Sequence, residues 1–245
     1  MGKYSAIVEY DGTDYRGFQA QPGNTRTVQG ELYRALRTLA DDFDQFSYAG
    51  RTDAGVHAKH QVICFRTGRS LDLYRFKWKL NCLLPDDIAI KDIRTAGDNF
   101  DARKDAKWRQ YSYFVVNNNY QSVFLKRYSL LITKKMDLEV MRIAADRFVG
   151  VRDFASFCSN KKPAFTFREV TRFKIRRFPE GLIVFRITAN AFLYNMVRVI
   201  VGTVLEIGKG ERSIKSIDIA FKKKSRQSAG KIVPAKGLFL TDVVY

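Results

Sequence analysis

The order of strand-like and helix-like segments most constrains the fold of this chain. Segment 3–10, KYSAIVEY, has the composition of a β-strand and is followed by the polar, glycine-containing loop DGTDYRGFQAQPGNTRT. Apolar residues between Val28 and Leu39 then recur at helical spacing, which predicts a helix that ends near residue 40. The chain therefore opens with a strand, a long loop and a helix.

Strand-like and helix-like segments continue to the C-terminus. The expected strands are 60–67, 86–96, 107–118, 171–177, 182–187 and 237–245, and the expected helices are 70–83, 137–148, 191–207 and 213–220. Ser70 is the expected cap of the second helix. This mixture of hairpin-like and helix-separated strands predicts an α+β protein with two related halves, which we divide into domains 1–105 and 106–245.

The charge balance points to a polyanionic partner. The chain has 43 Lys and Arg residues against 25 Asp and Glu residues, a net charge of +18. Such an excess attracts nucleic acid or an acidic membrane surface, and the alternative is a soluble enzyme that is merely basic. The lysine-rich segment 221–237, FKKKSRQSAGKIVPAKG, is expected to be an exposed loop that either contacts phosphates or is simply solvated.

The cysteines and histidines do not form a metal-binding or disulfide pattern. The three cysteines are widely scattered, and His57 and His60 are the two histidines of the chain. Neither set has the spacing of a zinc site or a disulfide framework. We therefore expect no metal, and catalysis by carboxylates, arginines or tyrosines.

The sequence also predicts a cytoplasmic protein that does not enter a membrane. The longest apolar segment, 191–207, is interrupted by Asn195 and Arg198. The opening MGKYSAIVEY is too short and too soon acidic to resemble a signal peptide.

Three charged residues in two segments stand out as candidates for chemistry. The segment YAGRTDAGVHA places Arg51 and Asp53 one residue apart between glycines, where a simple turn would need only the Asp-Ala-Gly geometry. Arg198 lies in the apolar segment AFLYNMVRVIVGTV, and a buried guanidinium needs an anionic partner. Asp53 is the candidate partner, and a neighbouring cation would keep its carboxylate ionised.

A phosphatase reading of the first loop is disfavoured. The segment VEYDGTDY is similar to the aspartate-nucleophile phosphatases of the haloacid dehalogenase type. In those enzymes a carboxylate nucleophile lies two residues before the second aspartate, and here that position is Glu9. The longer side chain would misplace the attacking oxygen, and no acidic metal-binding pair follows.

Six segments in the same order resemble the TruA-type pseudouridine synthases, over essentially the whole chain. They are EYDGTDYRGFQAQ with TVQGEL, GRTDAGVHA, FDARKDAKWRQYSY, VRDFASF, AFLYNMVRVIVGTVLEIGKG and VPAKGLFLTDVVY. The sequence departs from the family pattern at Asp101, Tyr194 and Val233, which puts details of RNA contact in doubt but leaves the aspartate untouched. The resemblance implies mixed, mainly antiparallel sheets flanked by helices, with an active-site cleft between the halves.

The resemblance also implies the reaction and the site residues. The chain would isomerise uridine to pseudouridine in the anticodon stem-loop of tRNA, at positions thirty-eight to forty, as a homodimer. No cofactor is expected, because this reaction needs no redox change and no group donor. Asp53 would be the nucleophile and Tyr111 the active-site tyrosine. Arg51 would hold the extruded nucleotide, unless it contacts a phosphate or stabilises the loop. Arg198 would orient Asp53, unless it forms a structural ion pair with another acidic residue. The alternative is a non-catalytic tRNA-binding or tRNA-folding protein on the same scaffold.

Overall fold

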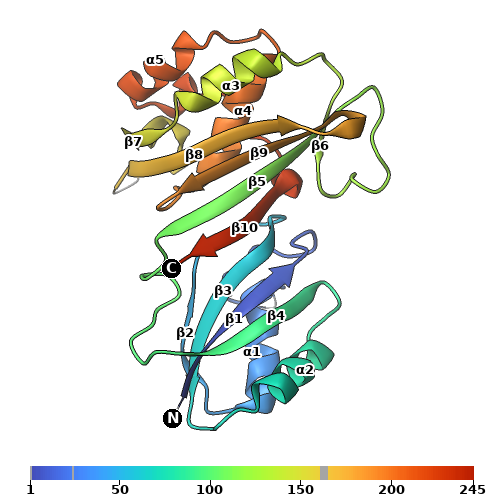
Figure 1. The fold of residues 1–245 in the computed structure, drawn as a ribbon, viewed down its shortest axis with the longest axis vertical. Helices are drawn as coiled ribbons and strands as arrows, with labels where there is room; N and C mark the ends of the chain where they lie inside the picture. The colour runs from blue at the N-terminus through green and yellow to red at the C-terminus, as the bar shows by residue number, and fades with distance from the viewer. Residues whose placement is uncertain (1, 24, 161–164) are drawn as a thin grey trace. The chain divides into compact units, whose positions relative to one another are not determined.

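The computed structural model describes residues 2–23, 25–160 and 165–245. It contains two compact units, Met1–Arg109 with Phe239–Tyr245, and Gln110–Leu238. The sequence predicts one domain, 1–105, that carries the loop with Asp53 and a second, 106–245, that carries Tyr111 and Arg198. This division stays a prediction. Figure 1 gives the order of the elements along the chain.

The first unit is a mixed sheet with two helices. Its strands are ordered β4-β1-β3-β10, and β2 pairs with β3. The pairs are antiparallel except for β10, which runs parallel to β3. The elements are β1 (Gly2–Tyr10), α1 (Val28–Leu39), β2 (Asp44–Tyr48), β3 (His57–Thr67), α2 (Leu73–Leu83), β4 (Ile88–Ala96) and β10 (Leu238–Val244).

Aromatic packing fixes helix α2 against the sheet of this unit. The ring of Phe65, on β3, lies 5.8 Å from that of Tyr4, 6.5 Å from that of Phe43 and 6.2 Å from that of Phe76 on α2. Phe65 is fully buried. Because side chains alternate across a strand, one aromatic position on β3 joins the sheet to a helix and a loop on the same face.

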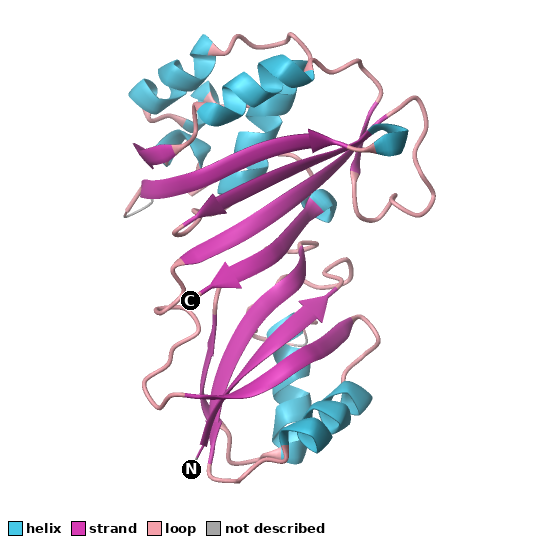
Figure 2. Ribbon diagram, in the orientation of Figure 1, coloured by secondary structure: helices cyan, strands magenta, loops and turns pink. Residues whose placement is uncertain are grey.

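The second unit has the strand order β5-β9-β8-β7, and β6 pairs in parallel with β5. Helices gather on one side of these strands (Figure 2), and α3 contacts both α4 and β8. The elements are β5 (Trp108–Asn117), β6 (Leu130–Ile132), α3 (Leu138–Asp146), β7 (Gly150–Asp153), β8 (Phe167–Arg177), β9 (Leu182–Ala189), α4 (Met196–Gly208) and α5 (Lys215–Lys223). The predicted α+β class with mixed, mainly antiparallel sheets flanked by helices is confirmed.

The prediction was wrong at the start of two helices. The expected helix 191–207 begins at Met196, because Asn195 has the left-handed φ of 60° and residues 191–195 lie outside the helix. Helix α2 is capped by Asp72, whose carboxylate accepts from the backbone N–H of Arg75 at 3.1 Å, and not by Ser70. Asn tolerates the left-handed conformation, so an apolar segment that reads as helix is interrupted there.

The lysine-rich segment 221–237 was wrongly expected to be exposed throughout. Helix α5 extends into it as far as Lys223. Farther along, Ala229, Gly230 and Val233 are buried, and the backbone N–H of Gly230 donates to Thr203 Oγ1 on α4 at 2.9 Å. A Cβ at Gly202 would lie 1.8 Å from the carbonyl oxygen of Lys231, so a glycine on α4 is what allows this close approach.

In the described part of the chain, no helix is long and apolar enough to cross a membrane.

Candidate active-site loop

Arg51 and Asp53 lie on the loop between β2 and β3, in the first unit. Between them, Thr52 is buried at 6% exposure, whereas Arg51 is exposed and Asp53 is half-buried. The middle side chain therefore fastens the loop to the protein, and the two charged side chains remain accessible to a substrate.

Three contacts hold the first half of this loop. The Tyr10 hydroxyl and Thr52 Oγ1 share a buried hydrogen bond of 2.7 Å. The Gln61 side chain bonds Gly50 twice, donating to its carbonyl at 2.7 Å and accepting from its N–H at 3.3 Å. Burial raises the pKa of the Tyr10 phenol, so this anchor is uncharged at neutral pH.

Arg109 braces the loop from a second segment of the same unit. Its Nε and Nη2 donate to the carbonyl oxygen of Ala49 at 3.1 and 2.9 Å, and other guanidinium hydrogens go to Ala106 and Arg103. This role of Arg109 was not predicted from the sequence. No local pattern marks it as a brace, because its acceptors are backbone carbonyls that carry no sequence signature.

The loop after β1 packs against the backbone of the candidate loop. The N–H of Phe18 donates to the carbonyl of Thr52 at 3.0 Å, and the N–H of Gly55 donates to that of Tyr15 at 3.3 Å. Gly17 has a φ of 102°, and a Cβ there would lie 2.9 Å from the oxygen of Thr52. A Cβ at Gly12 would lie 2.0 Å from the oxygen of Val56. Both glycines are needed because another backbone passes so close.

His57 is buried directly after the loop, where β3 begins. Its ring stacks on Phe239 of β10 at 4.4 Å. Its Nδ1 lies 3.1 Å from the backbone nitrogen of Gly12 and 2.9 Å from a carboxylate oxygen of Asp11. The histidine thus ties β10 and the first loop to the end of the candidate loop, a positioning role that sequence reasoning missed.

Tyr111 and Arg198 lie in the second unit. Tyr111, on β5, is 7% exposed, and its ring meets that of Phe192 edge to face at 5.1 Å. Arg198, in the first turn of α4, donates from Nε to the carbonyl of Val233 and from Nη1 to Asn195 Oδ1, both at 2.8 Å. Both side chains are therefore held in fixed orientations by their own unit. The predicted pairing of Arg198 with Asp53 stays a prediction.

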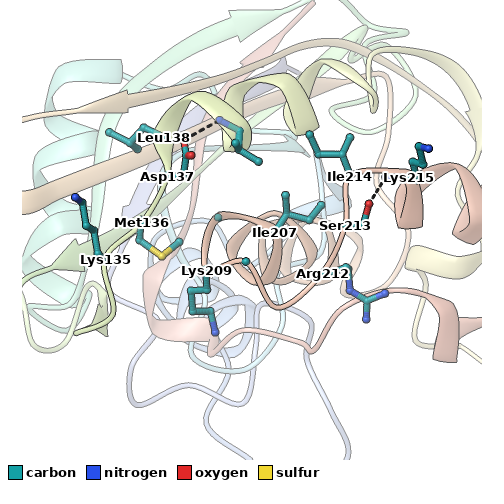
Figure 3. Close-up of a pocket in the computed structure, with 13 residues that line it drawn as sticks. Lys135, Met136, Asp137, Leu138, Ile207, Lys209, Arg212, Ser213, Ile214 and Lys215 are labelled. Atoms are coloured by element: carbon teal, nitrogen blue, oxygen red, sulfur yellow. Dashed lines mark hydrogen bonds between the residues drawn. The ribbon is translucent and has the colours of Figure 1, made fainter.

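A pocket of about 920 Å³ in the second unit contains none of the four predicted site residues. Figure 3 shows it between the start of α3 and the segment that follows α4. Asp137 accepts from the backbone N–H groups of Glu139 and Val140, which takes up the amides that an anion would use. Lys209 pairs with Glu211 at 3.0 Å and Arg212 with Glu206 at 2.9 Å, so these cations are partly neutralised.

Among the described residues, no group of three His, Cys, Asp or Glu side chains has the arrangement of a metal site. The chemistry available at the candidate loop is that of a carboxylate beside a guanidinium, in a chain with a large positive charge. That combination suits a polyanionic substrate, so the loop remains the candidate site.

Comparison with known proteins identifies the class of enzyme. The family model for tRNA pseudouridine synthase matches residues 6–104 and 144–245. These segments contain Arg51, Asp53 and Arg198, and Tyr111 lies between them. The chain belongs to the tRNA pseudouridine synthase family.

Curated relatives match along the whole chain. A tRNA pseudouridine synthase A of Geobacillus sp. (strain WCH70) is 46% identical, over 99% of this chain and 98% of the relative. Those of Bacillus subtilis (strain 168) and Bacillus pumilus (strain SAFR-032) are 40% and 39% identical, each over 99% of both chains. A solved archaeal box H/ACA sRNP Nop10-Cbf5 complex has a TM-score of 0.36 at 10% identity, over 83% of this chain and 44% of that chain, too slight a likeness to support a conclusion.

The protein is thus an isomerase that converts uridine to pseudouridine in tRNA. This finding decides between the two functions that the sequence left open, the enzyme and the non-catalytic tRNA-binding protein, in favour of the enzyme.

The Gly12 contact gives a test of how tightly the loop must be held. In Gly12→Ala the new Cβ cannot coexist with the Val56 carbonyl, so the backbone around Asp53 must shift. We expect turnover of tRNA to fall about 100-fold, because a displacement of roughly 1 Å at a site of reaction has a cost of that size. Gly97→Ala is the matched control, because a Cβ there meets nothing within 4 Å. Equal turnover in both variants would contradict a tightly held loop.

Proposed function

We propose that the enzyme modifies uridines at positions thirty-eight to forty of the tRNA anticodon stem-loop, with Asp53 as the nucleophile. The observation that carries the proposal is the way the loop presents Asp53. The buried Thr52 is fixed by Tyr10, and the half-buried carboxylate follows it directly, one residue from the exposed Arg51. The positions in tRNA rest on the family resemblance of the sequence.

The reaction is an isomerisation, so it needs no group donor and no net oxidation. The bond between uracil N1 and ribose C1′ breaks, the base turns, and a bond forms between C5 and C1′. The proton leaves C5, and N1 gains one. Three routes begin from Asp53: attack on the ribose, attack on the base, or removal of a ribose proton to give a glycal. Each of them requires an ionised carboxylate held against the nucleoside.

Arg51 is proposed to support the nucleotide once it has left the stack. A base inside a stem or loop must be extruded before its glycosidic bond can be reached, and the enzyme has to offset the lost stacking. The exposed guanidinium of Arg51 is available to fill the vacated space or to hold the neighbouring phosphate. Its position two residues before Asp53 couples extrusion to the placement of the carboxylate.

The resemblance extends the proposal to a homodimer that acts in the cytoplasm. The large positive charge supports binding to the tRNA backbone, which is read more through shape and phosphates than through base identity.

Replacing the carboxylate tests the central assignment. Asp53→Asn removes the charge but keeps the shape, and we expect turnover to become undetectable while tRNA affinity stays within about threefold, because phosphate contacts dominate binding. Tritium release from C5-labelled uridine in tRNA measures turnover, and a filter-binding assay measures affinity. Asp44→Asn, at an exposed position on β2, serves as the control. Appreciable release by folded Asp53→Asn protein would contradict the assignment.

Tyr111 is proposed to stack on the uracil. An isolated phenol, with a pKa near 10, is a weak base at neutral pH, and the ring is held at a fixed angle by Phe192. Tyr111→Phe keeps the ring, so we expect it to retain most of the turnover, whereas Tyr111→Ala should lose about 100-fold. A collapse of turnover in Tyr111→Phe, with the fold intact by circular dichroism, would instead assign the hydroxyl to proton transfer.

Arg198 is proposed to orient Asp53 and keep it ionised. In Arg198→Met, loss of the cation should raise the pKa of the carboxylate, so the acidic limb of the pH–rate profile should move to higher pH. Arg198→Lys should restore part of that limb, because it keeps the charge. Arg198→Met also leaves the Val233 carbonyl without its donor, at a cost of roughly 1–3 kcal/mol in stability. An unchanged pH–rate profile in Arg198→Met would show that Arg198 does not influence the ionisation of Asp53.

A further inference from the structure

Helix α2 presents two large aromatic side chains to solvent. Tyr74 is 78% exposed and Trp78 is 62% exposed. They are four residues apart, so they lie on the same side of the helix, roughly 5–6 Å from each other at Cβ. At 100° per residue this side is opposite to Phe76 and Leu80, which are buried. Exposed apolar residues that occur singly are normal, but a pair on one helical face marks an interaction site.

The helix is held firmly enough to act as a platform. Asn81 exchanges two hydrogen bonds with the backbone of Ile90 on β4, donating at 3.0 Å and accepting at 2.7 Å. Asp72 caps its first turn, and Phe76 packs on Phe65. The exposed rings of Tyr74 and Trp78 are therefore attached to a fixed backbone.

Cations flank the two rings. Arg75 and Lys79 follow Tyr74 and Trp78 directly and are also four residues apart, so they form a second exposed row beside the first. The helix carries no acidic residue between Leu73 and Leu83. The Asp72 carboxylate lies 3.6 Å from Arg75, but both groups are largely exposed and such a pair neutralises little.

We propose that this aromatic–basic face of α2, formed by Tyr74, Arg75, Trp78 and Lys79, binds unpaired bases of the tRNA substrate away from the uridine that reacts. Aromatic rings next to a row of cations match single-stranded RNA, whose bases stack on the rings while its phosphates lie along the charges. The family acts on tRNA, and the whole chain is strongly basic. RNA is therefore the occupant that both the chemistry and the charge favour.

The face carries its own reporters. The chain has two tryptophans, so Trp78 is the remaining one in a Trp108→Phe protein. Cys82 is exposed one turn beyond Trp78, whereas Cys64 and Cys158 are buried. The fluorescence of Trp78 and the alkylation rate of Cys82 therefore report on this helix.

The experiment titrates these reporters with an unmodified tRNA transcript and, in parallel, with a fully paired RNA duplex of similar length. We expect tRNA to quench Trp78 and to slow the alkylation of Cys82, and the duplex to do so much less. Trp78→Ala should weaken tRNA binding about tenfold, because stacking on one ring carries that much affinity. The double variant Arg75→Gln with Lys79→Gln should lose about two phosphate contacts. The slope of log affinity against log salt concentration should become less steep by the corresponding amount.

Tyr120→Ala is the matched control, because Tyr120 is an aromatic residue 57% exposed among uncharged neighbours, and its tRNA affinity should equal that of the unchanged protein. Equal affinity of Trp78→Ala and Tyr120→Ala, with Cys82 unprotected, would overturn the proposal. The proposal would also be overturned if the reporters responded to phosphatidylserine vesicles but not to tRNA, which would indicate a membrane-binding face. A change of solution mass in Trp78→Ala would overturn it as well, because the face would then be a contact between two copies of the chain. The readout is binding, so these outcomes are independent of the role proposed for Asp53.

Discussion

The close passage of two backbones in the first unit is the constraint on which the candidate active-site loop depends. The loop after β1 passes so near to residues 52–56 that Gly12 and Gly17 have no room for a side chain. The hydrogen bonds of Phe18 to Thr52 and of Gly55 to Tyr15 cross the same gap. A loop held only by its own turn would be flexible. This loop is hydrogen-bonded to the end of β1 through Tyr10 and to the backbone of the loop that follows β1. The carboxylate of Asp53 is thereby given a defined position before any RNA arrives.

In the second unit, too, a glycine allows two backbone segments to pass close together, here at α4. Gly202 admits the backbone of Lys231, and Thr203 and Arg198 bond to the segment that follows, at Gly230 and Val233. The guanidinium of Arg198 is thus oriented by neutral oxygens of its own unit. In both units a residue with a proposed role at the site is positioned by groups that take no part in the reaction, so loss of position and loss of chemistry can be separated by mutation.

The hydrophobic periodicity predicted most helices and strands to within a few residues, because burial of one face imposes a pattern that can be read from the chain. It failed where a local conformation overrode that pattern. Asn195 in the left-handed region delays α4 by five residues relative to the apolar segment. The short strands β2, β6 and β7 were missed, because they have too few residues to show alternation. The lysine-rich segment looked solvated by its composition, yet three small or apolar residues within it, Ala229, Gly230 and Val233, are buried.

The sequence by itself determined the α+β class, the positive charge that favours RNA and, through six ordered segments, the family. It singled out Asp53, Arg51 and Arg198, because charged residues in an unexpected setting can be recognised in the sequence alone, and the family resemblance added Tyr111. Only the tertiary structure decided what holds the Asp53 loop. Its supports are Tyr10, Gly12, Gln61, His57 and Arg109, which come from separate segments and act largely through backbone atoms. Such contacts depend on distances across the fold, and backbone carbonyls and amides are the same at every position of a sequence.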